Sequence, residues 1–139
     1  MVIIDATNLI LGRMASFAAR QALLGKDVII INCEKAMVTG NRSATLERYN
    51  IRLQRGSKDK GPFSYRKPHM FVKRAIRGML PYKRENGKKA FKRIRCYLGV
   101  PDELKNSKFE QIKKMDISKL DIPKYTTVKE ICNIMGWRL

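Results

Sequence analysis

Residues 1–31 constrain the fold more than any other part of the sequence, because two short apolar runs flank a stretch with helical spacing. The runs, at residues 2–5 and 28–31, consist almost entirely of Val and Ile, and β-branched residues are typical of strands. The stretch between them repeats apolar residues every three or four positions, which predicts a helix with one packed face: Leu11, Met14, Ala15, Ala18 and Ala22. A strand, a helix and a second strand predict a βαβ unit with parallel strands.

The rest of the sequence alternates helices and strands with two basic loops. We expect helices at 42–53 and 68–80, a short helix near 88–92, a strand at 94–98, a last helix from the capping box at 127–130, and loops at 55–67 and 82–89. We therefore predict an α/β fold with a small, mostly parallel sheet covered on both faces. The 139 residues suit one domain, residues 1–139, with a helical extension from about residue 103.

Positive charge is concentrated in the middle of the sequence. Residues 42–95 contain 18 of the 30 Lys and Arg residues but only three of the 12 acidic residues, so they carry +15 of the formal net charge of +18. A dense patch of like charge repels itself and destabilises an isolated fold, so we expect a polyanionic partner. Nucleic-acid phosphate is suitable because each phosphate contact releases a condensed counterion.

The residue types that catalysis or metal binding would need do not gather in the sequence. Cys33, Cys96 and Cys132 form no pair at metal-ligand spacing, and each lies among apolar residues, so we expect buried thiols without a disulfide. The single histidine, His69, has cations rather than carboxylates near it in sequence, and these should lower its pKa and keep it neutral. We expect no catalytic site, no metal, no cofactor and no small-molecule substrate.

The sequence disfavours a membrane or secreted protein, and it lacks the glycine motif of a nucleotide-binding protein. No apolar run approaches the ~20 residues of a membrane span, and the N-terminus lacks the charged region of a secretory signal, so we expect a cytoplasmic protein. Gly12 precedes the first predicted helix but belongs to no phosphate-binding glycine motif. We interpret Gly12 as a site of close helix packing or of a tight helix start.

The predicted helix at 68–80 has a cationic face. At ~100° per residue, its apolar residues fall on one half of the helical wheel, while Lys73, Arg74 and Arg77 fall on the other. Basic amphipathic helices also bind anionic lipid, but here the apolar half is needed for the protein core. The pattern therefore favours RNA over a membrane.

The basic loops contain aromatic residues that are able to stack on unpaired bases. Arginine is frequent in the same segment, and its planar fork suits phosphate. The expected RNA-binding residues are Arg42, Arg48, Arg52, Arg55, Lys58, Lys60, Phe63, Tyr65, Arg66, Lys67, Lys73, Arg74, Arg77, Tyr82, Lys83, Arg84, Lys88, Lys89, Arg93 and Arg95.

Several motifs resemble those of the large-subunit ribosomal protein L13 family. The motifs are Asp5-Ala6, Leu11-Gly12-Arg13, Ala15-Ser16, Gly25-Lys26 with Val28, Thr39-Gly40-Asn41, Arg77-Gly-Met-Leu-Pro81, Gly87 and Arg95-Cys-Tyr-Leu-Gly99. Residues 60–68 resemble the archaeal and eukaryotic branch, and the resemblance extends from residue 2 to about 102. It implies a three-layer α/β/α fold with a four-stranded parallel sheet. It also implies a non-catalytic constituent of the large subunit, bound to large-subunit ribosomal RNA beside other ribosomal proteins.

Two alternatives remain open from the residues themselves. The first is an RNA-modifying or nucleotide-using enzyme on a Rossmann-like sheet, whose site would lie at the turns near residues 8–13 and 39–41. The second is a regulatory binder of messenger RNA, which would use the same basic surface.

Overall fold

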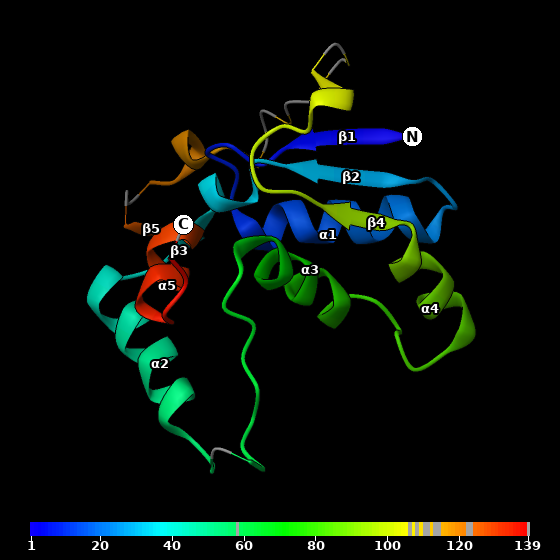
Figure 1. The fold of residues 1–139 in the computed structure, drawn as a ribbon. Coiled ribbons are helices and arrows are strands. Elements are labelled where there is room, and N and C mark those ends of the chain that lie inside the picture. Colours follow the sequence, from blue (N-terminus) through cyan, green and yellow to red (C-terminus); the bar gives the residue numbers. More distant parts are fainter. Residues whose placement is uncertain are drawn as a thin grey trace.

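The central sheet has three parallel strands. The computed structural model describes residues 1–57, 59–105, 107, 109, 112, 115–121 and 124–138 (Figure 1). β1 (Val2–Asp5), β2 (Val28–Ile31) and β4 (Ile94–Cys96) lie in the order β1-β2-β4, and both neighbouring pairs are parallel. α1 (Leu11–Leu23) connects β1 to β2, so the predicted βαβ unit is confirmed.

Each face of the sheet has its own apolar cluster. The further α-helices are α2 (Arg42–Gln54), α3 (Pro68–Gly78), α4 (Glu85–Lys92) and α5 (Val128–Ile134). On one face, Ile4, Ile30 and Ile94 share the main core with residues of α1, α3, α4 and α5. The second cluster consists of Ile3, Ile29 and Ile31 with Tyr97, Val100, Leu104 and Phe109. Both faces are therefore covered, as predicted.

The α/β class is confirmed, but the second cover differs from the α-helical layer that the family resemblance implies. Within the described ranges, the segment after β4 covers this face and forms only a short 3-10 helix, η2 (Asp102–Leu104). Gly99, with a φ of +60°, and Pro101 interrupt the chain before η2 and disfavour a continuous helix. A narrow sheet with only three isoleucines on this face, Ile3, Ile29 and Ile31, needs only a few apolar side chains to bury them.

A second, antiparallel pair of strands was not predicted. β3 (Met37–Thr39) pairs with β5 (Tyr125–Thr127), with Val38 opposite Thr126, so the described strands form a sheet of three and a sheet of two. β5 leads directly into α5, where the Thr127 hydroxyl accepts a hydrogen bond from the Glu130 amide at 3.2 Å. The predicted N-cap of the last helix is therefore confirmed.

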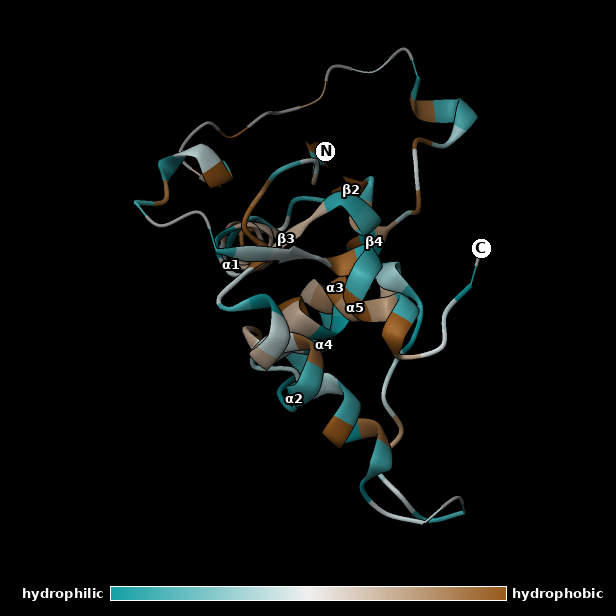
Figure 2. Cartoon of the chain, turned by 90° about the vertical axis from the view of Figure 1, so that its left-hand side faces the viewer, coloured by the Kyte–Doolittle hydropathy of each residue, from teal (hydrophilic) through white to brown (hydrophobic). Residues whose placement is uncertain are grey.

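α2 extends away from the body of the protein (Figures 1 and 2). None of its residues is fully buried, and only Leu46, Tyr49 and Leu53 pack partly against the main core. The helix begins after Asn41, whose side chain accepts a hydrogen bond from the Ser43 amide at 3.2 Å. Figure 2 shows hydrophilic residues over much of this helix, so it presents most of its surface to solvent.

Several predicted boundaries move in the structure. α4 begins at Glu85, so the predicted loop at 82–89 is wrong for its second half, and Lys88 and Lys89 lie on a helix. The strand expected at 94–98 ends at Cys96, and two further 3-10 helices occur, η1 (Cys33–Lys35) and η4 (Ile117–Lys119). Cys33 and Cys132 are buried free thiols, whereas Cys96 is only half-buried. None of the described helices has the length and apolar character needed to cross a bilayer.

Candidate nucleic-acid interface

α3 places its cations on one face because the opposite face belongs to the core. Pro68 is the first residue of this helix, where its missing amide hydrogen costs nothing. Val72 and Ile76 are fully buried, whereas Arg74 is exposed and Lys73 and Arg77 are half-buried. The predicted separation of apolar and cationic faces is therefore confirmed.

Each cation on this face of α3 lies over an aromatic ring from a neighbouring segment. The three pairs, measured from Nζ or Cζ to the ring centroid, are Lys73 with Phe91 at 5.1 Å, Arg74 with Tyr65 at 5.8 Å and Arg77 with Tyr82 at 5.2 Å. All three distances are within the ~6 Å at which a cation is attracted by the electron-rich face of a ring. The rings come from α4 and from the segments immediately before and after α3.

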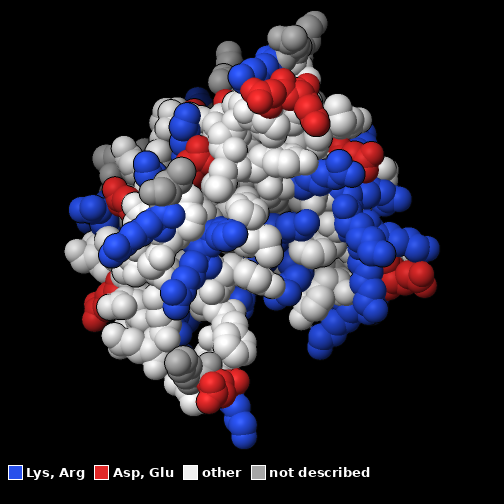
Figure 3. Space-filling view, viewed as in Figure 1, with Lys and Arg blue, Asp and Glu red and all other residues white. Residues whose placement is uncertain are grey.

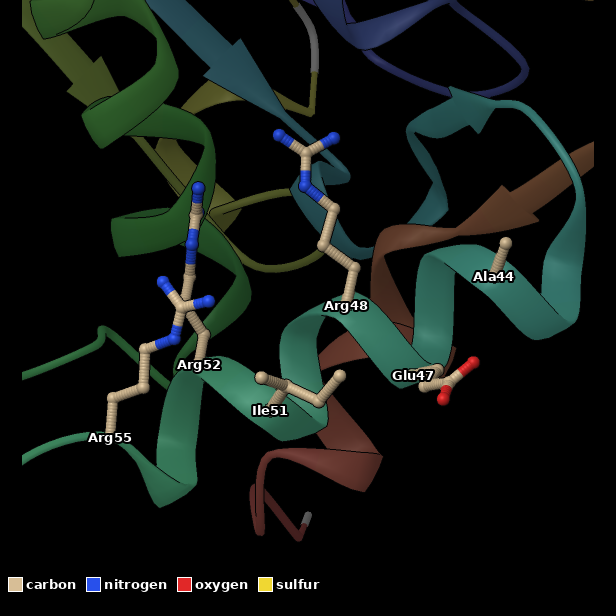
Figure 4. A pocket seen from close by; sticks show the side chains of 6 residues that line it. All are labelled: Ala44, Glu47, Arg48, Ile51, Arg52 and Arg55. Atoms are coloured by element: carbon tan, nitrogen blue, oxygen red, sulfur yellow. The ribbon is translucent and has the colours of Figure 1, made fainter.

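α2 contributes a row of arginines. Arg48, Arg52 and Arg55 line a shallow depression with Ala44, Glu47 and Ile51 (Figure 4). Arg52 also lies over the ring of Tyr49, with its Cζ 5.6 Å from the centroid. Arg42 differs from these three because its Nε donates a hydrogen bond to Glu130 Oε2 at 3.1 Å, which ties the start of α2 to α5.

The loop between α2 and α3 makes a close turn at two glycines. A Cβ on Gly56, whose φ is +86°, would lie 2.5 Å from Gly61 Cα, and a Cβ on Gly61 would lie 2.5 Å from the Ser57 carbonyl oxygen. Glycine is therefore required at both positions. Phe63 follows this turn with 73% of its surface exposed. The predicted contact Lys58 lies outside the described residues.

α4 adds a third cationic surface, which includes a residue that sequence reasoning missed. Lys88, Lys89 and Lys92 line a shallow pocket with Glu85, and Lys89 Nζ lies 3.5 Å from Glu85 Oε1. The short helix expected near 88–92 already contained Lys92, so its spacing from Lys88 was a signal that could have found it. Once the helix is known to span 85–92, the spacing of four residues from Lys88 places Lys92 on the same side.

Within the residues that the structure describes, most of this positive charge has no carboxylate partner. In the described part of the basic segment 42–95, ion pairs occur only at Arg42 and Lys89. Figure 3 shows many Lys and Arg side chains over α2, α3 and α4 on the face in view, with acidic atoms at the upper edge and in smaller groups at the left, right and lower edges. Cations of α2, α3 and α4, which are far apart in sequence, thus share the face in view.

Arg95 is not part of this group. It lies on β4 opposite Ile29 in the register of the sheet, so its side chain belongs to the sheet face that carries the second cluster. The main core and α3 lie on the other face. Arg95 is exposed, but it is separated by the sheet from the cations of α3.

Comparison with known proteins identifies the family. A family model described as ribosomal protein L13 matches residues 1–103. The chain belongs to the ribosomal protein L13 family. A relative named large ribosomal subunit protein uL13 from Archaeoglobus fulgidus is 41% identical over 137 residues, which cover 98% of this chain and 88% of the relative. The protein of the same name from Methanosarcina barkeri is 44% identical over 137 residues and 98% of both chains, and that from Haloarcula marismortui is 38% identical over 97% of this chain and 90% of the relative.

One motif that carries the resemblance to the L13 family has a packing explanation. Gly87, in the first half of α4, lies against the turn that follows α3. A Cβ at this position would be 2.1 Å from the carbonyl oxygen of Pro81 and 2.9 Å from the amide nitrogen of Tyr82. The segment 77–81 and Gly87 are thus parts of one contact, which holds the first half of α4 against the turn that follows α3.

Gly12, in another motif of the L13 family, loses one of its two expected explanations. A Cβ at this position would meet nothing within 4 Å, so the predicted close packing is wrong. Gly12 is the second residue of α1 and is exposed. The remaining part of the interpretation, a tight start to the helix, is compatible with this place.

Asp5 and Asn32 occupy the carboxyl end of β1 and β2, where a Rossmann-like enzyme would bind its ligand. Asp5 Oδ1 accepts hydrogen bonds from the Thr7 amide at 3.0 Å, the Thr7 hydroxyl at 2.7 Å and Asn32 Nδ2 at 2.9 Å. Burial pulls the pKa of the Asp5 carboxyl upward, but the hydrogen bonds from Asn32 and Thr7 hold it below its ordinary value. This carboxylate therefore has a structural role in holding the turns after the two strands.

His69 is neutral in its surroundings. Partial burial, followed by the charges of Lys67 and Lys73, holds its pKa below the ordinary value, in the direction that the sequence predicted. Its Nδ1 atom is buried and makes no hydrogen bond to any part of the chain that the structure describes. The ring therefore adds no charge to the interface at neutral pH.

Proposed function

We propose that this chain is a structural constituent of the large ribosomal subunit and binds large-subunit ribosomal RNA through the cationic face of α2, α3 and α4. The observation that carries the proposal is the number of cations on this face that have no carboxylate partner among the residues the structure describes, together with membership of the L13 family. Such a surface is stabilised when phosphates replace the missing counter-charges. The protein would act in the cytoplasm, within the ribosome and beside other large-subunit proteins.

The proposed contacts divide into two kinds. Arginines and lysines of the interface bind phosphates, which position the protein but carry little sequence information. Specificity then comes from the shape of folded RNA and from exposed aromatic residues such as Phe63. The proposed RNA-binding set is the one expected from the sequence, with Lys92 added and with Arg95 on a separate face.

Replacement of two arginines on α3 tests the proposal. Arg74→Glu combined with Arg77→Glu reverses charge at the centre of the interface, and we expect RNA affinity to fall by at least about 100-fold, since charged contacts are worth about 1.5–3 kcal/mol each. Affinity is measured by filter binding to a transcript of large-subunit ribosomal RNA. Circular dichroism of the same variant should match the parent, because Arg74 is exposed and Arg77 is half-buried.

A matched control separates local contact from net charge. Lys119→Glu combined with Lys124→Glu changes the net charge by the same amount at two exposed positions outside the interface. This variant should bind RNA with nearly the affinity of the parent and sediment with the large subunit on a sucrose gradient. Equal losses in the two variants would show that the net charge of the chain, rather than the proposed face, controls binding.

A further inference from the structure

We infer that Tyr65, Tyr82 and Phe91 hold the cations of α3 in position for phosphate, rather than serving as platforms on which RNA bases stack. This inference rests on the proposed function and assigns a positioning role within the same interface. It changes the expectation from the sequence, in which Tyr65 and Tyr82 were base-stacking residues.

The first argument is that one face of each ring is already occupied. Arg74, Arg77 and Lys73 lie 5.8, 5.2 and 5.1 Å from the ring centroids. A base that approached the same face would have to displace the cation, which would remove a phosphate-binding charge from the interface. Phe91 also packs against the main core, which further limits the access of a base to this ring.

The second argument is that the three rings come from three different segments. Tyr65 precedes α3, Tyr82 follows it, and Phe91 lies on α4. The turn at residues 79–84 is held against α4 by the contact between Pro81 and Gly87. The chain therefore surrounds one helical face with aromatic side chains, each beneath a different cation.

α2 also holds a cation over an aromatic ring, and this cation, Arg52, lines the same small pocket as Arg74 of α3. Arg52 lies over Tyr49, and the Tyr49 ring meets the Phe71 ring edge-on, with centroids 5.3 Å apart and an interplanar angle of 60°. Arg52 and Arg74 both line a small pocket of about 30 Å³ between α2 and α3. The ring of Tyr49 packs partly against the main core, so the cation above it lies over a ring that has contacts of its own.

Phe63 provides the contrast. It is 73% exposed, and within the described ranges no cation lies over its ring. Stacking on an unpaired base therefore remains its proposed role, while the other rings act through their cations. A long basic side chain that is held before binding loses less conformational freedom on binding.

A double-mutant cycle on Arg77 and Tyr82 tests the inference. Binding to a transcript of large-subunit ribosomal RNA is measured for Arg77→Met, Tyr82→Leu and the double variant. We expect Tyr82→Leu alone to weaken binding about 2- to 5-fold, which corresponds to one exposed cation–ring contact. In the double variant the affinity should equal that of Arg77→Met, because the ring has no effect without the cation. If the loss of affinity in the double variant instead equals the product of the losses in the two single variants, the inference is wrong.

A second probe distinguishes positioning from stacking. On a fully paired RNA duplex, which offers no unpaired base, Tyr82→Leu should weaken binding by the same factor as on the transcript. An effect confined to the transcript would mean that Tyr82 stacks on a base. Tyr82→Phe keeps the ring and should restore the affinity that Tyr82→Leu loses.

The result for the arginines separates this inference from the proposed function. If Arg74→Glu with Arg77→Glu leaves RNA binding unchanged, the interface itself is wrong. If Arg77→Met weakens binding but the losses multiply with Tyr82→Leu, the interface stands and only the positioning role is wrong. Tyr82 is 42% exposed, and circular dichroism of each variant shows whether it folds.

Discussion

At the scale of single residues, Gly87 shows how one missing side chain positions the interface. Its backbone approaches the turn after α3 so closely that a Cβ would overlap the Pro81 carbonyl group, at 2.1 Å from the oxygen and 2.4 Å from the carbon. Both are backbone atoms, so no side-chain rotation relieves the overlap. The placement of Tyr82 and of the cations around it therefore requires a residue without a Cβ at position 87.

We expect Gly87→Ala to lower the free energy of unfolding by about 1–3 kcal/mol, the usual cost of forcing extra atoms into a packed site. Denaturant unfolding monitored by circular dichroism measures this change. The matched control is Gly78→Ala, at the end of α3, where a Cβ would meet nothing within 4 Å. The control should be neutral or up to about 1 kcal/mol more stable, because alanine favours a helix. Equal stability of the two variants would rule out the packing explanation.

At the scale of secondary-structure elements, α1 and α2 have the same length but opposite roles. Each has 13 residues; α1 buries six of them, whereas α2 buries none fully. α2 is attached to the body through three partly buried side chains and through the pair between Arg42 and Glu130. That pair is exposed on both sides and contributes less than about 1 kcal/mol. α2 is therefore a basic arm on a rigid base.

Native-state hydrogen exchange tests this difference. Amides in α2 should exchange through local opening with a free energy at least about 2 kcal/mol smaller than those in α1, since each buried Leu or Met alone contributes about that much. α1 serves as the internal control because it has the same length. Binding to the ribosomal RNA transcript should slow exchange in α2. Equal protection of both helices in the free protein would contradict the description of α2 as a loosely attached arm.

At the scale of the whole molecule, the distribution of charge determines the behaviour. A body with little net charge carries a cationic face formed by α2, α3 and α4, although these helices come from separate parts of a 54-residue segment, residues 42–95. The packing of α3 against α1 and of α4 against the turn at Pro81 brings them to the same side. The result is an extended surface that fits the backbone of folded RNA better than a closed ligand pocket.

RNA affinity should therefore fall steeply with salt. With about 6–10 phosphate contacts, the association constant is expected to drop about 10³- to 10⁵-fold between 50 and 200 mM salt on the scale of double-stranded DNA. Filter binding over this range measures the slope. In the Arg74→Glu and Arg77→Glu variant, the plot of log affinity against log salt concentration should become shallower by the equivalent of at least two phosphate contacts. The Lys119 and Lys124 control should keep the slope of the parent. A flat response would exclude the electrostatic mechanism.

Local patterns in the sequence determined the helices and strands whose apolar residues recur at one clear spacing. The βαβ unit follows from two β-branched runs around a helical spacing, and α3 follows from Pro68 with apolar and cationic residues on opposite faces. The concentration of charge was also visible without coordinates, as was the family motif around residues 77–99. These features depend on residues close together in the sequence, and they can therefore be predicted from the sequence alone.

Tertiary structure alone decided the features that join distant residues. β3 and β5 are three residues each and pair across 88 positions, and strands this short have no local signature. The cover over Ile3, Ile29 and Ile31 is an irregular segment because three side chains need little area. The rings beneath Lys73 and Arg77 became visible only when α3, α4 and the turn between them packed together. Contacts of this kind are stabilised by burial and close approach between residues far apart in the sequence. A short stretch of sequence contains no information on either.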